Sequence, residues 1–283
     1  MGINKINNQD LPQSTTPPAT TTPTISLSSA TPVFGQLTVT VSNHANYTNP
    51  NYSAECTLAD GTVTVTDANI DRNLESDGSH LSDTLNIVDA NASTAQRTIT
   101  VKAQEFEDRK QSAGVTATYT PSFIQNKYIR IRGVDSSGNN SASYMGISDI
   151  RFYTAGAQSG TAYPTTNLTA NDSETGIVIS AGHFFSDFYA PWKACDAVTN
   201  SSGGMWWSLQ TSAANNFWQI EFEDGTYSTK PIIKSVLVRI TQFFIPTHIK
   251  ITGSDNADHS SATDYGTFAM SIPSSGTTQN TFG

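Results

Sequence analysis

The stretch Asn216-Phe-Trp-Gln-Ile-Glu-Phe222 places large apolar side chains at every second position: Trp218, Ile220 and Phe222. Successive side chains of a β-strand point to opposite faces, so these three lie on one face. The stretch therefore predicts a strand whose Trp218 face packs in a core. The same two-residue period recurs far away in the sequence, as in Thr62-Val-Thr-Val-Thr66. Together these patterns predict an all-β protein.

Seven short alternating segments fill residues 24–121. This is the number of strands expected of an Ig-type β-sandwich. The region has one Cys and no Trp, so the Cys…Trp…Cys core of antibody domains is missing. It resembles the bacterial and phage Ig-like modules that pack without a disulfide. The predicted strands are Thr24–Ser28, Gln36–Ser42, Ser53–Leu58, Thr62–Asp67, Thr84–Val88, Arg97–Ala103 and Gly114–Tyr119.

The chain of 283 residues exceeds the ~100–200 residues of one average domain, so we expect two domains, at residues 24–121 and 122–283. It carries 15 basic and 24 acidic residues, a net charge of −9, and no cluster of Lys or Arg along the sequence. Affinity for nucleic acid depends on neutralising phosphate charge. Nucleic acid is therefore not an expected partner.

The ends and the cysteines of the chain give three further expectations. The sequence shows no apolar stretch of the ~20 residues that cross a bilayer and no apolar core of a secretory signal, so we expect neither membrane insertion nor Sec export. Residues 1–23, with the Thr/Pro tract Ser14–Pro23, predict a disordered docking tether, a frayed terminus without a role being the alternative. Cys56 and Cys195 are predicted to be free, buried thiols.

Four stretches beyond residue 122 resemble the discoidin (coagulation factor 5/8 type C) family of galactose-binding-like jelly rolls. They are Pro191–Asp196 with Trp206–Ser208, Asn216–Phe222, Ile232–Ile240 and Thr247–Asp255, and they follow one another in the family's order. The resemblance implies a discoidin-like jelly-roll sandwich for residues 122–283, after the Ig-like sandwich.

The last two strands of that family are found here before the others, as Tyr128–Arg132 and Gly146–Tyr153. We interpret this order as a circular permutation, which costs little when the termini of a domain lie close together. The less favoured alternative assigns residues 122–153 to the end of the first domain. Permuted units of this kind resemble those of tailed-phage fibres and other virion appendages, which implies a virion protein.

No catalytic arrangement is predicted, so the chain is expected to be non-enzymatic. Its histidines have no metal-ligand spacing, and Gly146-Ile-Ser148-Asp-Ile150 lacks the final Gly of a nucleophile elbow. A glycosidase with paired carboxylates stays open as an alternative, because two such acids meet only in the folded structure.

Aromatic residues gather in the segment Ala181–Trp192, which is expected to form loops at one end of the jelly roll. Rings on such loops stack on sugar faces or anchor protein interfaces, and composition does not separate these uses. Packing beneath the loops is the alternative for each ring. The predicted glycan- or partner-binding residues are Phe184, Phe185, Phe188, Tyr189, Trp192, Trp207, Arg239 and Phe243.

The resemblance also implies a structural calcium ion (Ca2+) beneath the binding loops. Its ligands would be Asp149, Asp196 and Asn200, whose oxygen atoms suit this hard cation. The sequence departs from the family here, since Ala197 replaces a Gly and Asp149 replaces a Glu. The alternative is that Asp196 caps a turn through its own backbone.

With the resemblance, these features predict a phage virion structural protein, either a capsid decoration protein or a tail-fibre appendage. The N-terminal segment would bind other virion proteins, the chain would form a homo-oligomer on the particle, and the jelly roll would bind host-surface glycans. The alternative is a pair of carbohydrate-binding modules from a secreted or cell-surface glycosidase.

Overall fold

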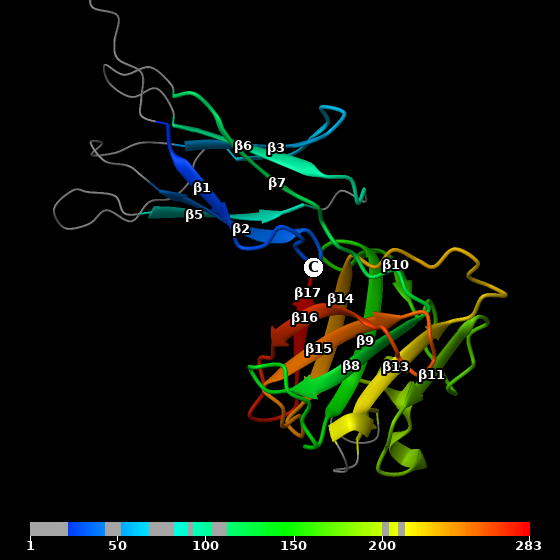
Figure 1. Cartoon of the computed structure of the whole chain (residues 1–283). Helices are drawn as coiled ribbons and strands as arrows, with labels where there is room; N and C mark the ends of the chain where they lie inside the picture. The colour runs from blue at the N-terminus through cyan, green and yellow to red at the C-terminus, as the bar shows by residue number, and fades with distance from the viewer. Residues whose placement is uncertain are drawn as a thin grey trace, which may run out of the picture. The chain divides into compact units, whose positions relative to one another are not determined.

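The computed structural model of the chain describes residues 22–42, 52–67, 82–89, 93–103, 112–199, 204–208 and 213–283. In these ranges the chain is built almost wholly of antiparallel β-sheets, which confirms the all-β prediction (Figure 1). Most of the predicted tether, residues 1–21, lies outside the described residues. None of the helices within the described ranges is long and apolar enough to cross a membrane.

The first of two compact units comprises the described residues within 22–28, 38–86 and 97–118. All seven strands predicted for this region are present, within a residue or two of the expected bounds. They are β1 (Thr24–Leu27), β2 (Gln36–Ser42), β3 (Tyr52–Leu58), β4 (Val63–Asp67), β5 (Ser82–Val88), β6 (Arg97–Ala103) and β7 (Val115–Tyr119). They form a three-stranded sheet in the order β1-β2-β5 and a four-stranded sheet in the order β4-β3-β6-β7.

The core of the first unit follows the predicted alternation. Val39 and Val41 of β2 and Ile99 and Val101 of β6 are fully buried, whereas the threonines between them are partly exposed. Cys56 of β3 is a free, buried thiol, as predicted. β-branched residues therefore fill most of this core, in which the side chain of Arg97 is also fully buried.

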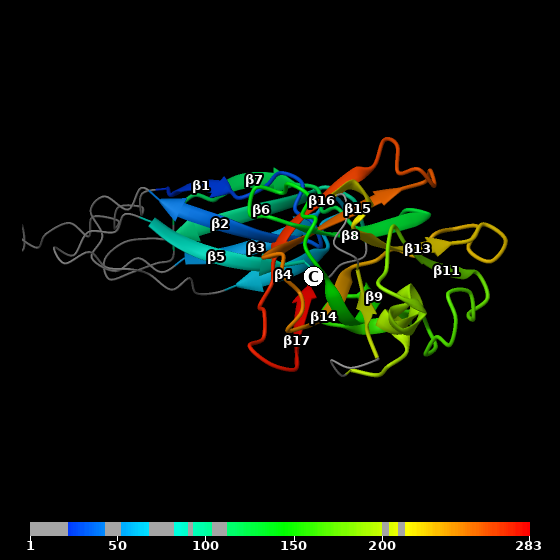
Figure 2. The same cartoon turned by 90° about the horizontal axis from the view of Figure 1, so that it is seen from below.

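The second unit comprises residues 29–37, 87–96 and 119–283. Its strands are β8 (Tyr128–Val134), β9 (Gly146–Ala155), β10 (Ser159–Tyr163), β11 (Ile177–Ala181), β12 (Trp206–Trp207), β13 (Phe217–Phe222), β14 (Ser235–Thr241), β15 (His248–Ser254), β16 (Thr263–Ala269) and β17 (Thr277–Phe282). One sheet has the order β10-β9-β14-β17, with β12 beside β9, and the other has the order β11-β13-β8-β15-β16. Figure 2 shows them as two layers.

The core of the second unit lies between these sheets. Trp218, Ile220 and Phe222 of β13 are fully buried, as their alternation predicts. The Trp218 ring stacks on Phe152 of β9 at 6.1 Å between centroids, and its indole N–H donates a hydrogen bond of 3.0 Å to the carbonyl oxygen of Pro191. The Trp218 ring thus buries its apolar face and satisfies its polar atom, whereas the indole N–H of the equally buried Trp206 has no hydrogen-bond partner in the described residues.

The segment 122–153 lies in the middle of the second unit. β8 pairs with β13 on one side and β15 on the other, and β9 pairs with β14. The alternative that this segment ends the first domain is therefore wrong. The boundary is also less simple than the sequence indicated, because residues 29–37 and 87–96 group with the second unit. Phe34 explains part of this grouping, since its buried ring stacks on Phe268 at 6.0 Å.

Candidate functional site

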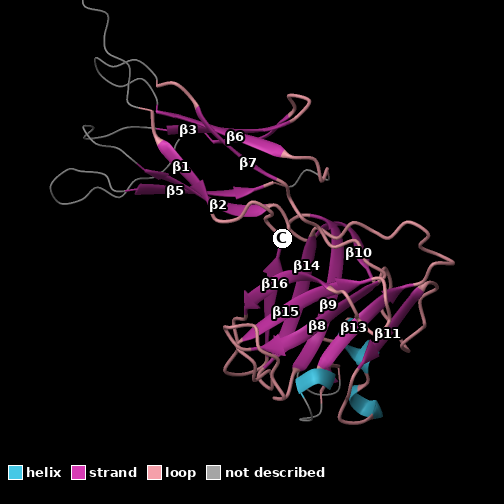
Figure 3. Cartoon of the chain, in the orientation of Figure 1, coloured by secondary structure: helices cyan, strands magenta, loops and turns pink. Residues whose placement is uncertain are grey.

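The segment Ala181–Trp192 leads from β11 through two short 3₁₀ helices, η1 (Asp187–Tyr189) and η2 (Pro191–Cys195). Figure 3 shows the helices gathered at one end of the second unit. The segment begins at Gly182, where only glycine fits. A Cβ atom at this position would clash with the carbonyl oxygen of Asn215, at 1.9 Å. Pro191 begins η2, where its missing N–H costs no helical hydrogen bond. The sequence thus fixes a loop that crosses this end of the unit.

A surface hollow opens beside this segment, with a volume of about 530 Å³. The rings of Phe184 and Trp192 line it together with the polar side chains of Asn171, Asp172 and Asp187. We call it the aromatic hollow. Both rings are half-buried and pack against the core, which holds them in place. The hollow therefore combines two aromatic residues held by the core with hydrogen-bonding groups, and the Lys193 ammonium lies over the Trp192 ring at 4.3 Å from its centroid.

Asn171 positions one wall of the aromatic hollow. Its side-chain oxygen accepts a hydrogen bond of 3.2 Å from the backbone N–H of Trp192, and its backbone oxygen accepts one of 2.7 Å from the N–H of Ile179. One residue thus joins η2 to β11. Sequence reasoning missed Asn171 and Asp172, and no pattern indicated them, because only folding brings their loop beside η2.

Glu174 holds that loop closed. One carboxylate oxygen accepts hydrogen bonds from the backbone N–H and the hydroxyl of Thr165, at 3.0 and 2.8 Å. The other carboxylate oxygen accepts hydrogen bonds from the backbone N–H and the hydroxyl of Thr166, each at 2.9 Å. Burial opposes ionisation of Glu174, but these hydrogen bonds to the carboxylate outweigh it and lower its pKa below the ordinary value of 4.5. The ionised side chain therefore stabilises the loop.

Trp207 is the centre of a second group of rings. Phe185 and Phe243 stack on it from 5.2 Å each, and Tyr189 meets it edge-on at 5.1 Å. Phe188, 60% exposed, contacts Tyr189 at 5.0 Å. We call these five residues the Trp207 cluster. Phe243 joins it from the loop after β14. The neighbouring Trp206 is fully buried.

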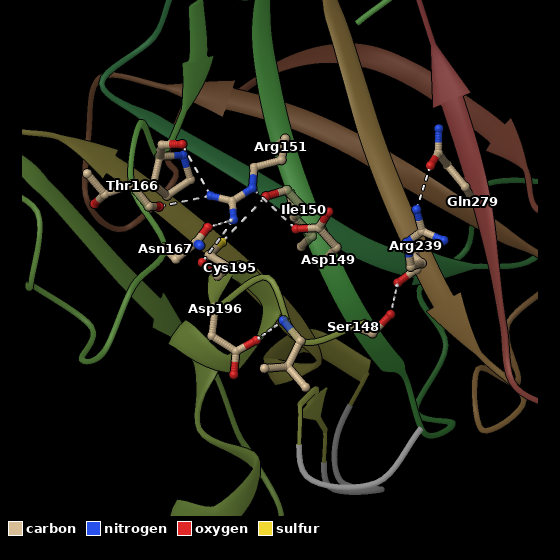
Figure 4. A network of polar contacts seen from close by, with 12 residues as sticks. Ser148, Asp149, Ile150, Arg151, Thr166, Asn167, Cys195, Asp196, Arg239 and Gln279 are labelled. Carbon is tan, nitrogen blue, oxygen red and sulfur yellow. Dashed lines mark hydrogen bonds and ion pairs between the residues drawn. The ribbon is translucent and has the colours of Figure 1, made fainter. Parts of the chain in front are cut away.

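The predicted binding residues therefore divide into groups. Phe184 and Trp192 line the aromatic hollow, whereas the five residues of the Trp207 cluster pack on one another. Arg239 joins neither group through a ring contact or a hydrogen bond in the described residues. Its guanidinium donates to the side-chain oxygen of Gln279 on β17 at 2.7 Å, as Figure 4 shows. Arg239, a predicted binding residue, therefore lies apart from both groups.

Arg151 is the centre of the polar network in Figure 4. Its guanidinium donates to the backbone oxygens of Thr166 at 3.1 Å and Cys195 at 3.0 Å, and to the side-chain oxygen of Asn167 at 3.1 Å. These bonds tie the loop closed by Glu174 to the end of η2. Cys195 itself is a free, buried thiol, as predicted, and burial raises its pKa. Arg151 is therefore a positioning residue for the aromatic hollow.

The two described calcium-ligand candidates lie beside this network. Burial raises the pKa of both Asp149 and Asp196, and each carboxylate also interacts with the Arg151 cation. The Asp149 oxygen lies 3.3 Å from the Arg151 Nε, close enough for an ion pair but without hydrogen-bond geometry. Asn200, the third candidate, lies outside the described residues.

Asp196 also makes the turn that was the alternative to calcium binding. One oxygen accepts a hydrogen bond of 2.8 Å from the backbone N–H of Val198, which leaves Ala197 between them at φ 64°. In the described ranges, no group of three or more His, Cys, Asp or Glu side chains is placed to hold a metal ion. Calcium binding stays a prediction.

Comparison with known proteins does not assign the chain to a family. No family model matches the chain, and a search of curated proteins finds no match. The class that the structure defines is a β-sandwich-like protein with a loop-built aromatic hollow.

Proposed function

We propose that the chain is a non-enzymatic binding protein whose second unit recognises a sugar in the aromatic hollow. The observation that carries the proposal is the union of the Phe184 and Trp192 rings with Asn171, Asp172 and Asp187 in one hollow. Sugar sites need a flat ring against the apolar face of the sugar and a few fixed acceptors for its hydroxyls. A volume of about 530 Å³ suits one or two sugar rings.

Exposure of the two acids favours binding over glycoside hydrolysis. Asp172 and Asp187 both line the aromatic hollow, but both side chains are exposed to solvent. A glycosidase holds its acid in surroundings that keep it protonated at neutral pH. Exposed carboxylates instead accept hydrogen bonds from sugar hydroxyls. The proposal therefore keeps the non-enzymatic function.

The wider setting of the proposal rests on the resemblance to discoidin-like modules. We assign the first unit as an Ig-like sandwich and the second as a circularly permuted jelly roll, in which β8 and β9 supply the family's last two strands. The pairing of β8 with β13 and of β9 with β14 supports this assignment. In this setting the protein belongs to a phage virion, residues 1–23 dock it on the particle, and the second unit binds host-surface glycans.

One experiment tests the binding site and the setting together. Trp192→Ala removes a ring of the aromatic hollow, and Phe188→Ala is the matched control, because Phe188 lies in the same segment but in the Trp207 cluster. Each full-length variant is measured on an array of neutral sugars and for incorporation into purified phage particles. We expect Trp192→Ala to weaken sugar binding by about 2 kcal/mol, or about 30-fold, with incorporation unchanged.

Three results would contradict the proposal. The first is unchanged sugar binding by Trp192→Ala, and the second is loss of binding by Phe188→Ala instead. The third is absence of the wild-type protein from particles, which rejects the virion setting and leaves the glycosidase-module alternative. Trp192→Phe keeps a ring in the hollow and separates loss of stacking from loss of folding.

A further inference from the structure

Three cations project from one face of the sheet that contains β8 and β15, which lie side by side in Figure 1. Arg130 and Arg132 alternate along β8 with the buried Ile129 and Ile131. Lys250 stands directly opposite Arg132 in the β8–β15 register. Like charges in opposite positions destabilise a sheet. In a chain with a net charge of −9, this grouping calls for a reason beyond folding.

The three cations line a second hollow, with a volume of about 460 Å³. We call it the basic hollow. Loops at its rim add the neutral side chains of Asn139 and Asn140, and β15 adds Thr252. The sequence shows no run of Lys or Arg, because the register of β8 and β15 brings these three cations together.

Neutral groups anchor both arginines. Arg130 donates to the side-chain oxygen of Gln219 and, at 2.9 Å, to the backbone oxygen of Ala257. Arg132 donates to the backbone oxygen of Ala214 at 2.9 Å. The ring of Phe217 lies beside both guanidinium groups, at 4.1 Å from that of Arg130 and 5.3 Å from that of Arg132. These contacts fix the guanidinium groups without neutralising them.

Acidic side chains offset this charge only in part. Lys250 pairs with the exposed Asp264 at 2.7 Å, and Asp258 lines the basic hollow and attracts Arg130. Among the described residues, however, neither Arg130 nor Arg132 has an acidic partner within ion-pair distance. Burial, together with repulsion from Arg132, lowers the pKa of Arg130 to about 10. A bound anion would relieve that repulsion.

We propose that the basic hollow binds the carboxylate or sulfate group of an acidic sugar. The planar guanidinium groups of Arg130 and Arg132 match the paired oxygens of such an anion, and Lys250 adds a third charge. The Asn139 amide nitrogen donates to Asp135 and the Thr252 hydroxyl bonds to His259, which leaves each side chain one further polar position for the hydroxyls of the sugar ring. The acidic net charge of the chain disfavours a long polyanion such as nucleic acid.

An NMR titration of the full chain tests this site. Glucuronate is the probe, glucose is its neutral counterpart, and inorganic sulfate and a short single-stranded DNA are the other arms. We expect glucuronate to shift the resonances of the basic hollow and glucose to leave them unchanged. Glucuronate binding should weaken as salt is added. Arg132→Gln should weaken it at least tenfold.

Two further variants guard this test against misfolding and against a general charge effect. Lys250→Gln removes a second charge of the basic hollow, on a partly exposed side chain that pairs with Asp264. Lys230→Gln removes an equal charge outside it, where Lys230 pairs with Asp224. We expect weaker glucuronate binding in Lys250→Gln and unchanged binding in Lys230→Gln.

The proposal does not require the aromatic hollow to bind sugar, and Trp192→Ala should leave glucuronate binding intact. A failure of either site is thus distinguishable from a failure of the other. Equal binding of glucose and glucuronate would overturn the proposal, as would unchanged binding in both Arg132→Gln and Lys250→Gln. If sulfate bound as tightly as glucuronate, the basic hollow would be an anion site without selectivity for a sugar. If the DNA bound more tightly than glucuronate, the basic hollow would be a nucleic-acid site. Each of these results also rejects the acidic sugar.

Discussion

The aromatic hollow and the basic hollow belong to the same unit but are built differently. The aromatic hollow takes its side chains mainly from loops and 3₁₀ helices, which single residues such as Asn171 and Glu174 hold in place. The basic hollow takes its cations from neighbouring strands, whose register fixes them. Strand-built sites therefore depend on the whole sheet, whereas loop-built sites depend on a few replaceable contacts. Changes to the loop contacts should affect only the aromatic hollow.

The largest effect is expected from Glu174→Gln. The neutral side chain loses the carboxylate that accepts four hydrogen bonds from Thr165 and Thr166, and its amide nitrogen would face two of those donors. We expect the free energy of unfolding to fall by about 2 kcal/mol, less than for a fully buried carboxylate because solvent screens it. Sugar binding at the aromatic hollow should weaken with it, and glucuronate binding should not change.

The pH dependence of Glu174→Gln follows from the lowered pKa of Glu174. Its ionised form contributes full stability above the ordinary value of 4.5, and this contribution is lost as the pH falls through the lowered pKa. Denaturant unfolding of both proteins between pH 7 and pH 3 should therefore show the difference shrinking in acid. A constant difference across this range would show that Glu174 does not act through its charge.

Calcium binding is expected to change stability less than Glu174→Gln does. Like that variant, it should act on the aromatic hollow and not on the basic hollow. An ion held by Asp149, Asp196 and Asn200 would stabilise the end of η2 and leave the basic hollow unchanged. At free calcium ten times the dissociation constant, the folded state gains about 1.4 kcal/mol. The melting midpoint should rise with calcium, return with a chelator, and not respond in Asp149→Asn. An unchanged melting midpoint at millimolar calcium would reject calcium binding and leave Asp196 with its role in the turn only.

The smallest effect is expected from Ala197→Gly. Ala197 has φ 64° in the turn that Asp196 closes, a conformation that costs an L-residue about 1–2 kcal/mol and glycine nothing. Glycine adds about 0.4–1 kcal/mol of chain entropy in the unfolded state. The net gain in stability is about 0.5 kcal/mol, measurable by denaturant unfolding. Destabilisation instead would show that the turn is not held in this conformation, and Ala269→Gly on β16 is the control for a change at ordinary φ.

The amino-acid sequence alone determined where the strands of the first unit run and which face of several strands is buried, but it did not predict β10, β11, β16 and β17 of the second unit. Two-residue alternation is a local property, so it located all seven strands of the first unit and placed Trp218 in the core of the second. The density of aromatic residues in Ala181–Trp192 separately predicted a binding segment that contains Phe184 and Trp192. Each of these inferences uses residues that are neighbours along the chain.

Tertiary structure alone decided which segments meet. Phe184 and Phe185 are adjacent in sequence, yet one lines the aromatic hollow and the other stacks on Trp207. The arginines of β8 are visible as an alternating pair, but only the pairing of β8 with β15 brings Lys250 beside them. The physical reason is that strand register and loop closure depend on contacts between segments far apart in the chain, which no local pattern records.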